Sequence, residues 1–168
     1  GARVVLKNNT ANTTFINNVL TATTADGVVR GPETGAEITK NVIMNYNYSP
    51  AFSSYRFGWF FNVDGIEMVG NSLDGTNTYD FLNCGGYIKG IVNISDNFYT
   101  NGKQSFLYCK GVGVLDATIE GNRVEGIANT IIDFRNMVEN GDVKFNIRYN
   151  VMIESGTGWF PIRIRTAG

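Results

Sequence analysis

An asparagine recurs along this chain in one fixed setting. The setting is an apolar residue, any residue, an apolar residue, two spacers, Asn, one spacer and a final apolar residue. Its six copies lie 23 to 30 residues apart and centre on Asn18, Asn41, Asn71, Asn97, Asn122 and Asn150. A pattern repeated at this period over a whole chain predicts similar structural units stacked on one another.

Each copy has the composition of two strands joined by a sharp turn. Residues alternate between apolar and polar before the turn, and two or three strand-like residues follow it. Asn suits such a turn because it tolerates the left-handed backbone conformation, and stacked Asn side chains can hydrogen-bond to one another. A further strand follows about twelve residues later, around Val28-Val29, Trp59-Phe60-Phe61, Leu82-Asn83-Cys84, Leu107-Tyr108-Cys109, Ile132-Asp133-Phe134 and Ile162-Arg163-Ile164. An extra copy, Val4-Val5-Leu6, opens the chain.

Three strands in about 25 residues exclude most repeat architectures. Two helices would need more residues and would not alternate with a period of two, and propeller blades are longer. We therefore predict an all-β fold, a right-handed parallel β-helix of about six to seven coils formed by residues 1–168 as one domain. We expect three parallel sheets, with the Asn ladder at the turn between the second and third strands of each coil.

Composition excludes several functions. The net charge of −1 gives no overall field for nucleic acid or an anionic membrane, and no apolar run is long enough to span a bilayer. The absence of histidine removes His-based triads, His-ligated zinc and imidazole acid–base chemistry.

Two cysteines, Cys84 and Cys109, occupy the same place in successive repeats. Stacked parallel strands would set them about 4.8 Å apart as small buried groups. Two cysteines make no metal site, although this separation also admits a disulfide.

The six Asn-centred motifs resemble those of the pectin-lyase-like family of right-handed β-helices. The chain is also similar, without a shared signature motif, to β-helix domains of secreted or lipid-anchored proteins of gut Bacteroidetes. The resemblance implies a secreted or cell-surface protein of bacterial or phage origin. It also implies that a polysaccharide lies along the first sheet, in a groove walled by the loops between the third and first strands.

Alternation assigns the faces of the first strand. With Leu82/Cys84 and their equivalents inward, the expected outward rows are Phe81, Phe106, Ile131 and Trp159; then Asn83, Tyr108, Asp133 and Pro161; then Gly85, Lys110, Arg135 and Arg163. Aromatic faces pack on sugar rings and cations pair with uronate carboxylates. We expect the ligand-binding residues to be Phe106, Tyr108, Lys110, Asp133, Arg135, Trp159 and Arg163, with Tyr48 and Tyr55 from a long loop that overhangs this face. The apolar row has an alternative role, packing beneath a loop or against another chain.

Catalysis is the second hypothesis, because the resemblance includes polysaccharide lyases and glycoside hydrolases. The weak candidates are Asp133, Lys110 and Arg135. Polygalacturonase-like sites contain a Gly-His-Gly segment that this chain lacks. Calcium prefers several carboxylates, and only Asp133 falls on the first strand, so we expect neither calcium nor another cofactor. Asp133 also lacks an acidic companion there, unless Glu154 or Asp80 approaches from a flanking loop.

A structural shaft is the third hypothesis. The chain opens and closes on first-strand segments without an amphipathic helix to cover them. Exposed strand edges favour pairing, so we expect a segment of a longer protein, with neighbouring domains or a homo-oligomer at the ends. The residues favour binding of a uronate-type polysaccharide over the two alternatives.

Overall fold

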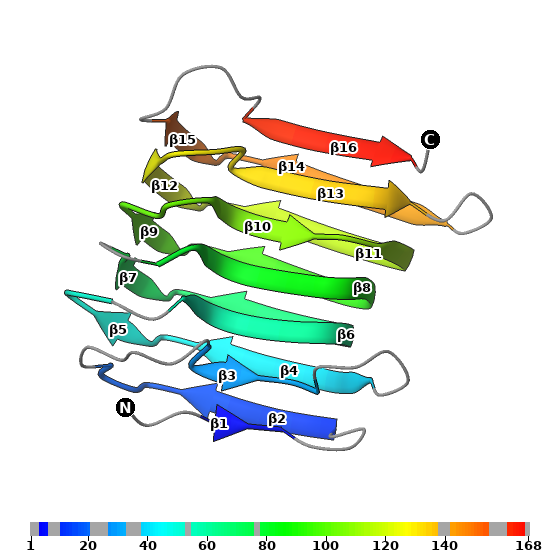
Figure 1. Cartoon of the computed structure of the whole chain (residues 1–168), viewed down its shortest axis with the longest axis horizontal. Coiled ribbons are helices and arrows are strands. Elements are labelled where there is room, and N and C mark those ends of the chain that lie inside the picture. Colours follow the sequence, from blue (N-terminus) through cyan, green and yellow to red (C-terminus); the bar gives the residue numbers. More distant parts are fainter. Residues whose placement is uncertain are drawn as a thin grey trace.

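In the computed structural model, every regular element is a β-strand, and the strands stack into a single coil (Figure 1). Among the residues that it describes, the structure has no helix that is long and apolar enough to cross a membrane. The described residues are 4–6, 11–20, 27–32, 38–52, 55–75, 78–137, 142–154 and 161–166.

Each circuit of the chain crosses three faces. The first face consists of β1 (Val4–Val5), β3 (Val29–Arg30), β10 (Ser105–Cys109), β13 (Ile132–Met137), β16 (Ile162–Thr166) and the first halves of β6 (Arg56–Val69) and β8 (Asp80–Ser95). The second consists of β2 (Ala11–Ile16), β4 (Thr39–Asn45), β11 (Val112–Glu120), β14 (Val143–Arg148) and the second halves of β6 and β8. The third consists of β5 (Tyr48–Ser49), β7 (Ser72–Asp74), β9 (Phe98–Thr100), β12 (Arg123–Ile127) and β15 (Val151–Glu154).

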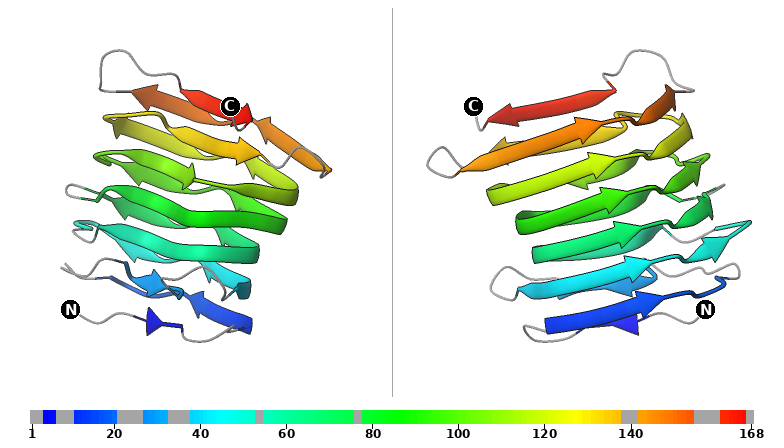
Figure 2. Two further views of the ribbon diagram at one scale, coloured as in Figure 1. Left: turned by 45° about the vertical axis from the view of Figure 1, so that its right-hand side comes forward. Right: turned by 180° about the vertical axis from the view of Figure 1, so that it is seen from behind.

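The coil is parallel and right-handed, as predicted. In Figure 1 the first-face strands β10, β13 and β16 point right in front, while the second-face strands point left behind as the chain rises. The views of Figure 2 show the same order after a 45° turn and from behind. The segments predicted for the first strand pair in the expected sequence, Val4, Val29, Gly58, Leu82, Leu107, Ile132 and Ile162.

Two details of the predicted architecture differ. Hydrogen bonding makes one eleven-stranded and one five-stranded sheet rather than three sheets, because β6 and β8 continue unbroken around the corner between the first and second faces. The described residues form about five turns instead of six to seven. The fold class is unaffected, because every strand pairing described is parallel.

A ladder of asparagines joins the coils at the turn between the second and third faces. The side-chain amide of Asn71 donates to Oδ1 of Asn97 at 2.9 Å and to the carbonyl of Met44 at 2.7 Å, while its own Oδ1 accepts from Nδ2 and the backbone N–H of Asn47. Both amide hydrogens and both carbonyl lone pairs are thus satisfied, which a buried amide requires. The same axial bond continues through Asn18, Asn47, Asn71, Asn97, Asn122 and Asn150.

Asn41 was wrongly placed in this ladder; Asn47 holds the position. Asn47 sits two residues before Ser49 rather than before an apolar residue, so the sequence pattern did not select it. Asn41 lies on the second face, exposed and in the left-handed region (φ 49°), and donates to Asn12. The ladder residues themselves do not need that conformation. The residue before each of them adopts it: Asn17, Tyr46, Gly70, Asp96, Gly121 and Tyr149.

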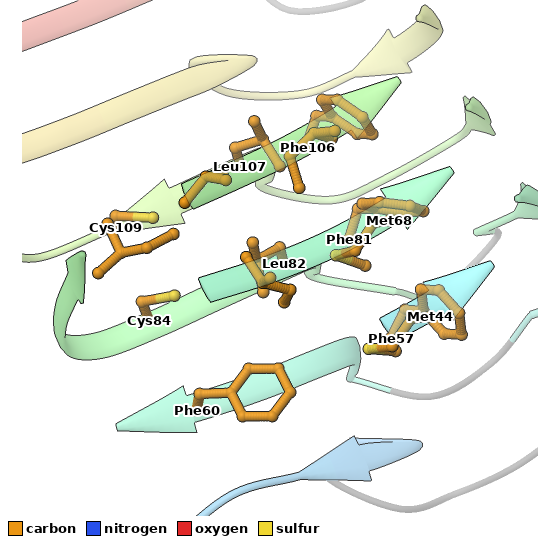
Figure 3. Close-up of a cluster of buried hydrophobic side chains, with 14 of the residues drawn as sticks. Met44, Phe57, Phe60, Met68, Phe81, Leu82, Cys84, Phe106, Leu107 and Cys109 are labelled. Carbon is orange, nitrogen blue, oxygen red and sulfur yellow. The ribbon is translucent and has the colours of Figure 1, made fainter. Parts of the chain in front are cut away.

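The core contains a stack of aromatic rings at the corner before the first face (Figure 3). The ring centroids of Phe57 and Phe81 are 5.3 Å apart and those of Phe81 and Phe106 are 4.7 Å apart. These three residues and Ile131 are completely buried, so the predicted outward row of Phe81, Phe106 and Ile131 is wrong. Alternation fails here because the chain turns the corner, and two consecutive side chains such as Phe81 and Leu82 both point into the core.

The ladder leads to a stability prediction. Replacing Asn97 with Ala removes its side-chain bonds and leaves buried partners on the adjacent coils unsatisfied. We expect the free energy of unfolding to fall by about 2–4 kcal/mol in urea denaturation. The matched control is Asn41→Gly, which keeps a residue tolerant of positive φ and should change stability by less than ~1 kcal/mol. Equal losses in the two variants would contradict the ladder assignment.

Candidate functional site

The outward side chains of the first face form columns along the coil axis. Register pairs Arg30 with Trp59, then Asn83, Tyr108, Asp133 and Arg163, in that order. Two residues further along their strands lie Lys110, Arg135 and Arg165, on successive strands of this face. Parallel strands are about 4.8 Å apart, so each column presents one side chain per coil at this spacing.

Asp133 is the centre of an ion-pair cluster. Arg135 Nε lies 2.8 Å from its Oδ2 and Arg163 Nε lies 2.9 Å from its Oδ1. The guanidinium of Arg135 also lies 4.9 Å from the centre of the Tyr108 ring, a cation–π contact. Four of the predicted binding residues, Tyr108, Asp133, Arg135 and Arg163, are therefore brought together.

The predicted row for Arg163 is wrong by two residues. We expected Pro161 beside Asp133 and Arg163 beside Arg135, but Arg163 pairs with Asp133 itself. The predicted strand alignment, which set Ile162-Arg163-Ile164 beside Ile132-Asp133-Phe134, already gives this pairing, so the row assignment and not the alignment was in error.

Trp59 is an aromatic residue of this face that sequence reasoning missed. The guanidinium carbons of Arg30 and Arg56 lie 4.2 Å and 4.8 Å from its ring centre. Arg56 Nε is 3.4 Å from the carboxylate of Asp80, which accepts from Asn83 at 2.8 Å. The signal was present: with Phe60 inward beside Cys84, alternation turns Trp59 outward next to Asn83.

A pair of stacked tyrosines borders the face at the corner with the third face. The rings of Tyr55 and Tyr79 are nearly parallel, at an interplanar angle of 11° and 4.8 Å between centroids. Lys103 Nζ lies 5.9 Å from the Tyr79 ring. Tyr55 thus adjoins the first face, as expected for its loop.

The other predicted binding residues lie in different parts of the structure. Tyr48 lies on the third face, where it pairs with Ser72 and is exposed, so its predicted position over the first face is wrong. Phe106 is in the core and presents nothing to a ligand. Lys110 is exposed and directly follows β10. Trp159 and the side chain of Glu154 lie outside the described residues.

Positive charge gathers on this face. Seven of the 14 Lys and Arg residues of the chain lie on it or at its bordering corner, and in its described part the carboxylates are Asp80 and Asp133. The seven are Arg30, Arg56, Lys103, Lys110, Arg135, Arg163 and Arg165. A chain with net charge −1 therefore carries a locally cationic surface, which attracts anions.

The pKa values of the two carboxylates of this face, Asp80 and Asp133, are shifted in opposite directions. Burial raises the pKa of Asp133, but hydrogen bonds and attraction from Arg163 and Arg135 outweigh burial and hold it below the usual 3.8. Asp80 is fully buried, and there burial dominates over Asn83 and Arg56, so the pKa of Asp80 lies above 3.8. Hydrogen bonding to Asp133 in turn raises the pKa of Arg135.

The two carboxylates belong to separate ion pairs and are not neighbours along the face. They lie two strands and three residues apart, which places their Cα atoms roughly 14 Å from each other. Each is also already bound by an arginine. Among the described residues, no group of three or more His, Cys, Asp or Glu side chains is arranged to hold a metal ion.

The opposite pKa shifts predict that Asp133 and Asp80 affect folding stability differently as pH falls. The lowered pKa of Asp133 contributes stability above its unfolded pKa of 3.8, and this is lost as pH falls through the folded pKa. The raised pKa of Asp80 contributes stability below 3.8 that is lost as pH rises through its folded value. We expect Asp133→Asn to cost about 3 kcal/mol at neutral pH and to flatten the acid limb of stability below about pH 4.

Asp80→Asn is the matched control and should cost less at neutral pH, because it removes a carboxylate whose burial opposes its charge. Urea midpoints measured from about pH 3 to pH 7 separate the two variants. Identical pH profiles would show that the cluster around Asp133 does not hold its charge as described.

The fold and this surface are the available guides to function, because neither a protein-family model nor a curated protein nor a solved structure matches the chain.

Proposed function

We propose that the first face binds an anionic, uronate-type polysaccharide. The observation that carries the proposal is the gathering of half the lysines and arginines of the chain on one face and its bordering corner. Guanidinium groups match carboxylates in shape and hydrogen bonding, and Lys110 adds an exposed point charge.

Aromatic rings on the same face supply the second element of sugar recognition. Trp59 and Tyr108 are partly exposed in the central column, and Tyr55 and Tyr79 border it. Cation–π contacts with Arg56 and Arg135 limit the freedom of the Trp59 and Tyr108 rings before a ligand arrives. Preorganised side chains lose less entropy on binding.

The direction of the columns favours an extended ligand. Because a column presents one side chain per coil at ~4.8 Å, a chain lying along the axis would meet successive strands with successive sugars. This arrangement, with the Asn ladder, is the basis for extending the proposal to kinship with pectin-lyase-like proteins. A secreted or cell-surface location, as in Bacteroidetes β-helix proteins or phage, belongs to the same proposal.

The binding test uses one matched pair of variants on each of two faces. We expect Tyr108→Ala and Lys110→Gln each to weaken binding of polygalacturonate about 5- to 10-fold, by loss of ring contact and of charge. Tyr149→Ala and Lys144→Gln, exposed positions on and beside the second face, should change it by less than about twofold. Isothermal titration calorimetry measures both, and raising salt should weaken binding because charge attraction is screened.

Equal loss in the two pairs of variants, or equal affinity for a neutral glucan, would overturn the proposed face. Turnover is followed in the same samples by ultraviolet absorbance of unsaturated products and by reducing-sugar release. A signal in either assay that is lost in Lys110→Gln would favour the lyase or hydrolase alternative over binding alone.

A further inference from the structure

The two cysteines of the chain lie directly opposite each other in adjacent coils. Cys84 on β8 and Cys109 on β10 are register partners, and both are completely buried. Figure 3 shows the two side chains one above the other, both directed into the core. Both are thiols in this structure.

We propose that Cys84 and Cys109 form a disulfide between coils when the chain folds in the presence of a small-molecule disulfide such as oxidised glutathione. The thiolate of one cysteine attacks oxidised glutathione and releases one reduced glutathione. The thiolate of the second then displaces the other glutathione and forms the S–S bond. The two protein thiols lose two electrons and two protons, and the oxidant takes them up as two glutathione thiols.

The register supports this bond. Directly paired parallel strands place Cα atoms about 4.8 Å apart, within the range of about 4.4–6.8 Å found across disulfides. The in-register β8–β10 pairing continues on both sides, through Leu82 with Leu107 and Ser105 with Asp80, so the two backbones are already held at this distance. The two side chains leave neighbouring strands in parallel, which sets their Cβ atoms about 4.8 Å apart, so a small approach of the strands brings them into the range of about 3.5–4.5 Å found across disulfides.

Burial decides when the bond forms. Loss of solvent raises the pKa of Cys109 well above its usual value, and the thiolate is the species that reacts. The folded reduced protein should therefore react slowly with oxidants, and the cross-link should form while the coils assemble. Once formed, it lies in the core, shielded from reductants.

The cross-link would tie together the strands that carry Asn83 and Tyr108, yet the inference does not depend on polysaccharide binding. It rests on the register and burial of the two thiols. Its test therefore uses mass and thermal stability, and no glycan is needed.

The experiment refolds the full chain from urea with either reduced or oxidised glutathione. The products are quenched in acid, unfolded, alkylated and weighed by mass spectrometry. We expect two alkylated thiols after reducing refolding and none after oxidising refolding, with no attached glutathione. The oxidised protein should melt roughly 5–10 °C above the reduced one, since the bond closes a loop of 25 residues.

Cys84→Val and Cys109→Val are the controls, because each keeps an apolar side chain of similar size and one thiol. After oxidising refolding each should show one thiol, alkylated or carrying glutathione. The proposal is overturned if the wild-type chain reaches its native circular dichroism spectrum in the oxidising buffer with both thiols still alkylated or both carrying glutathione. It is equally overturned if the bond forms but lowers the melting temperature.

Discussion

The structure depends on hydrogen bonding along its axis that keeps successive coils in register. Backbone bonds between parallel strands supply most of it, and the asparagine ladder fixes the turn between the second and third faces. Each buried ladder amide, such as that of Asn71, bonds to the coil above and the coil below, which satisfies all its polar atoms. A shift of one residue between coils would break these bonds and turn every inward side chain outward. The columns on the surface exist because this shift is excluded.

The cationic face follows from that register. Arg135 and Arg163 come from different coils, and they share one carboxylate because Asp133 is held between them. Arg30 and Arg56 likewise flank Trp59 from two coils. In this repeat the inward positions stay apolar, whereas the outward positions of the first face differ from coil to coil. The composition of the surface can therefore vary while the core stays the same. The two carboxylates of this surface differ in role because the environment of Asp133 supplies two cations, whereas the environment of Asp80 is dominated by burial.

Sequence reasoning placed Tyr108, Asp133, Arg135 and Lys110 on one face because alternation holds in the middle of a strand. It failed at corners, where Phe81 and Phe106 turn inward beside Leu82 and Leu107. It also failed at Asn41, because the true ladder residue, Asn47, is followed by Ser49 where the sequence pattern requires an apolar residue. Trp59 was within reach of the alternation argument, whereas its contacts with Arg30 and Arg56 were not.

The sequence by itself determined the β-helix, five of the six described ladder residues and the stacking of Cys84 on Cys109, because a short repeat of strand and turn residues has few ways to bury its apolar positions. Tertiary structure alone decided which loops shift the register, which side chains enter the core at corners, and that Asp80 lies buried beside Arg56. These depend on where the chain bends in space. Period-two alternation describes a straight strand and contains no information on the direction of a corner.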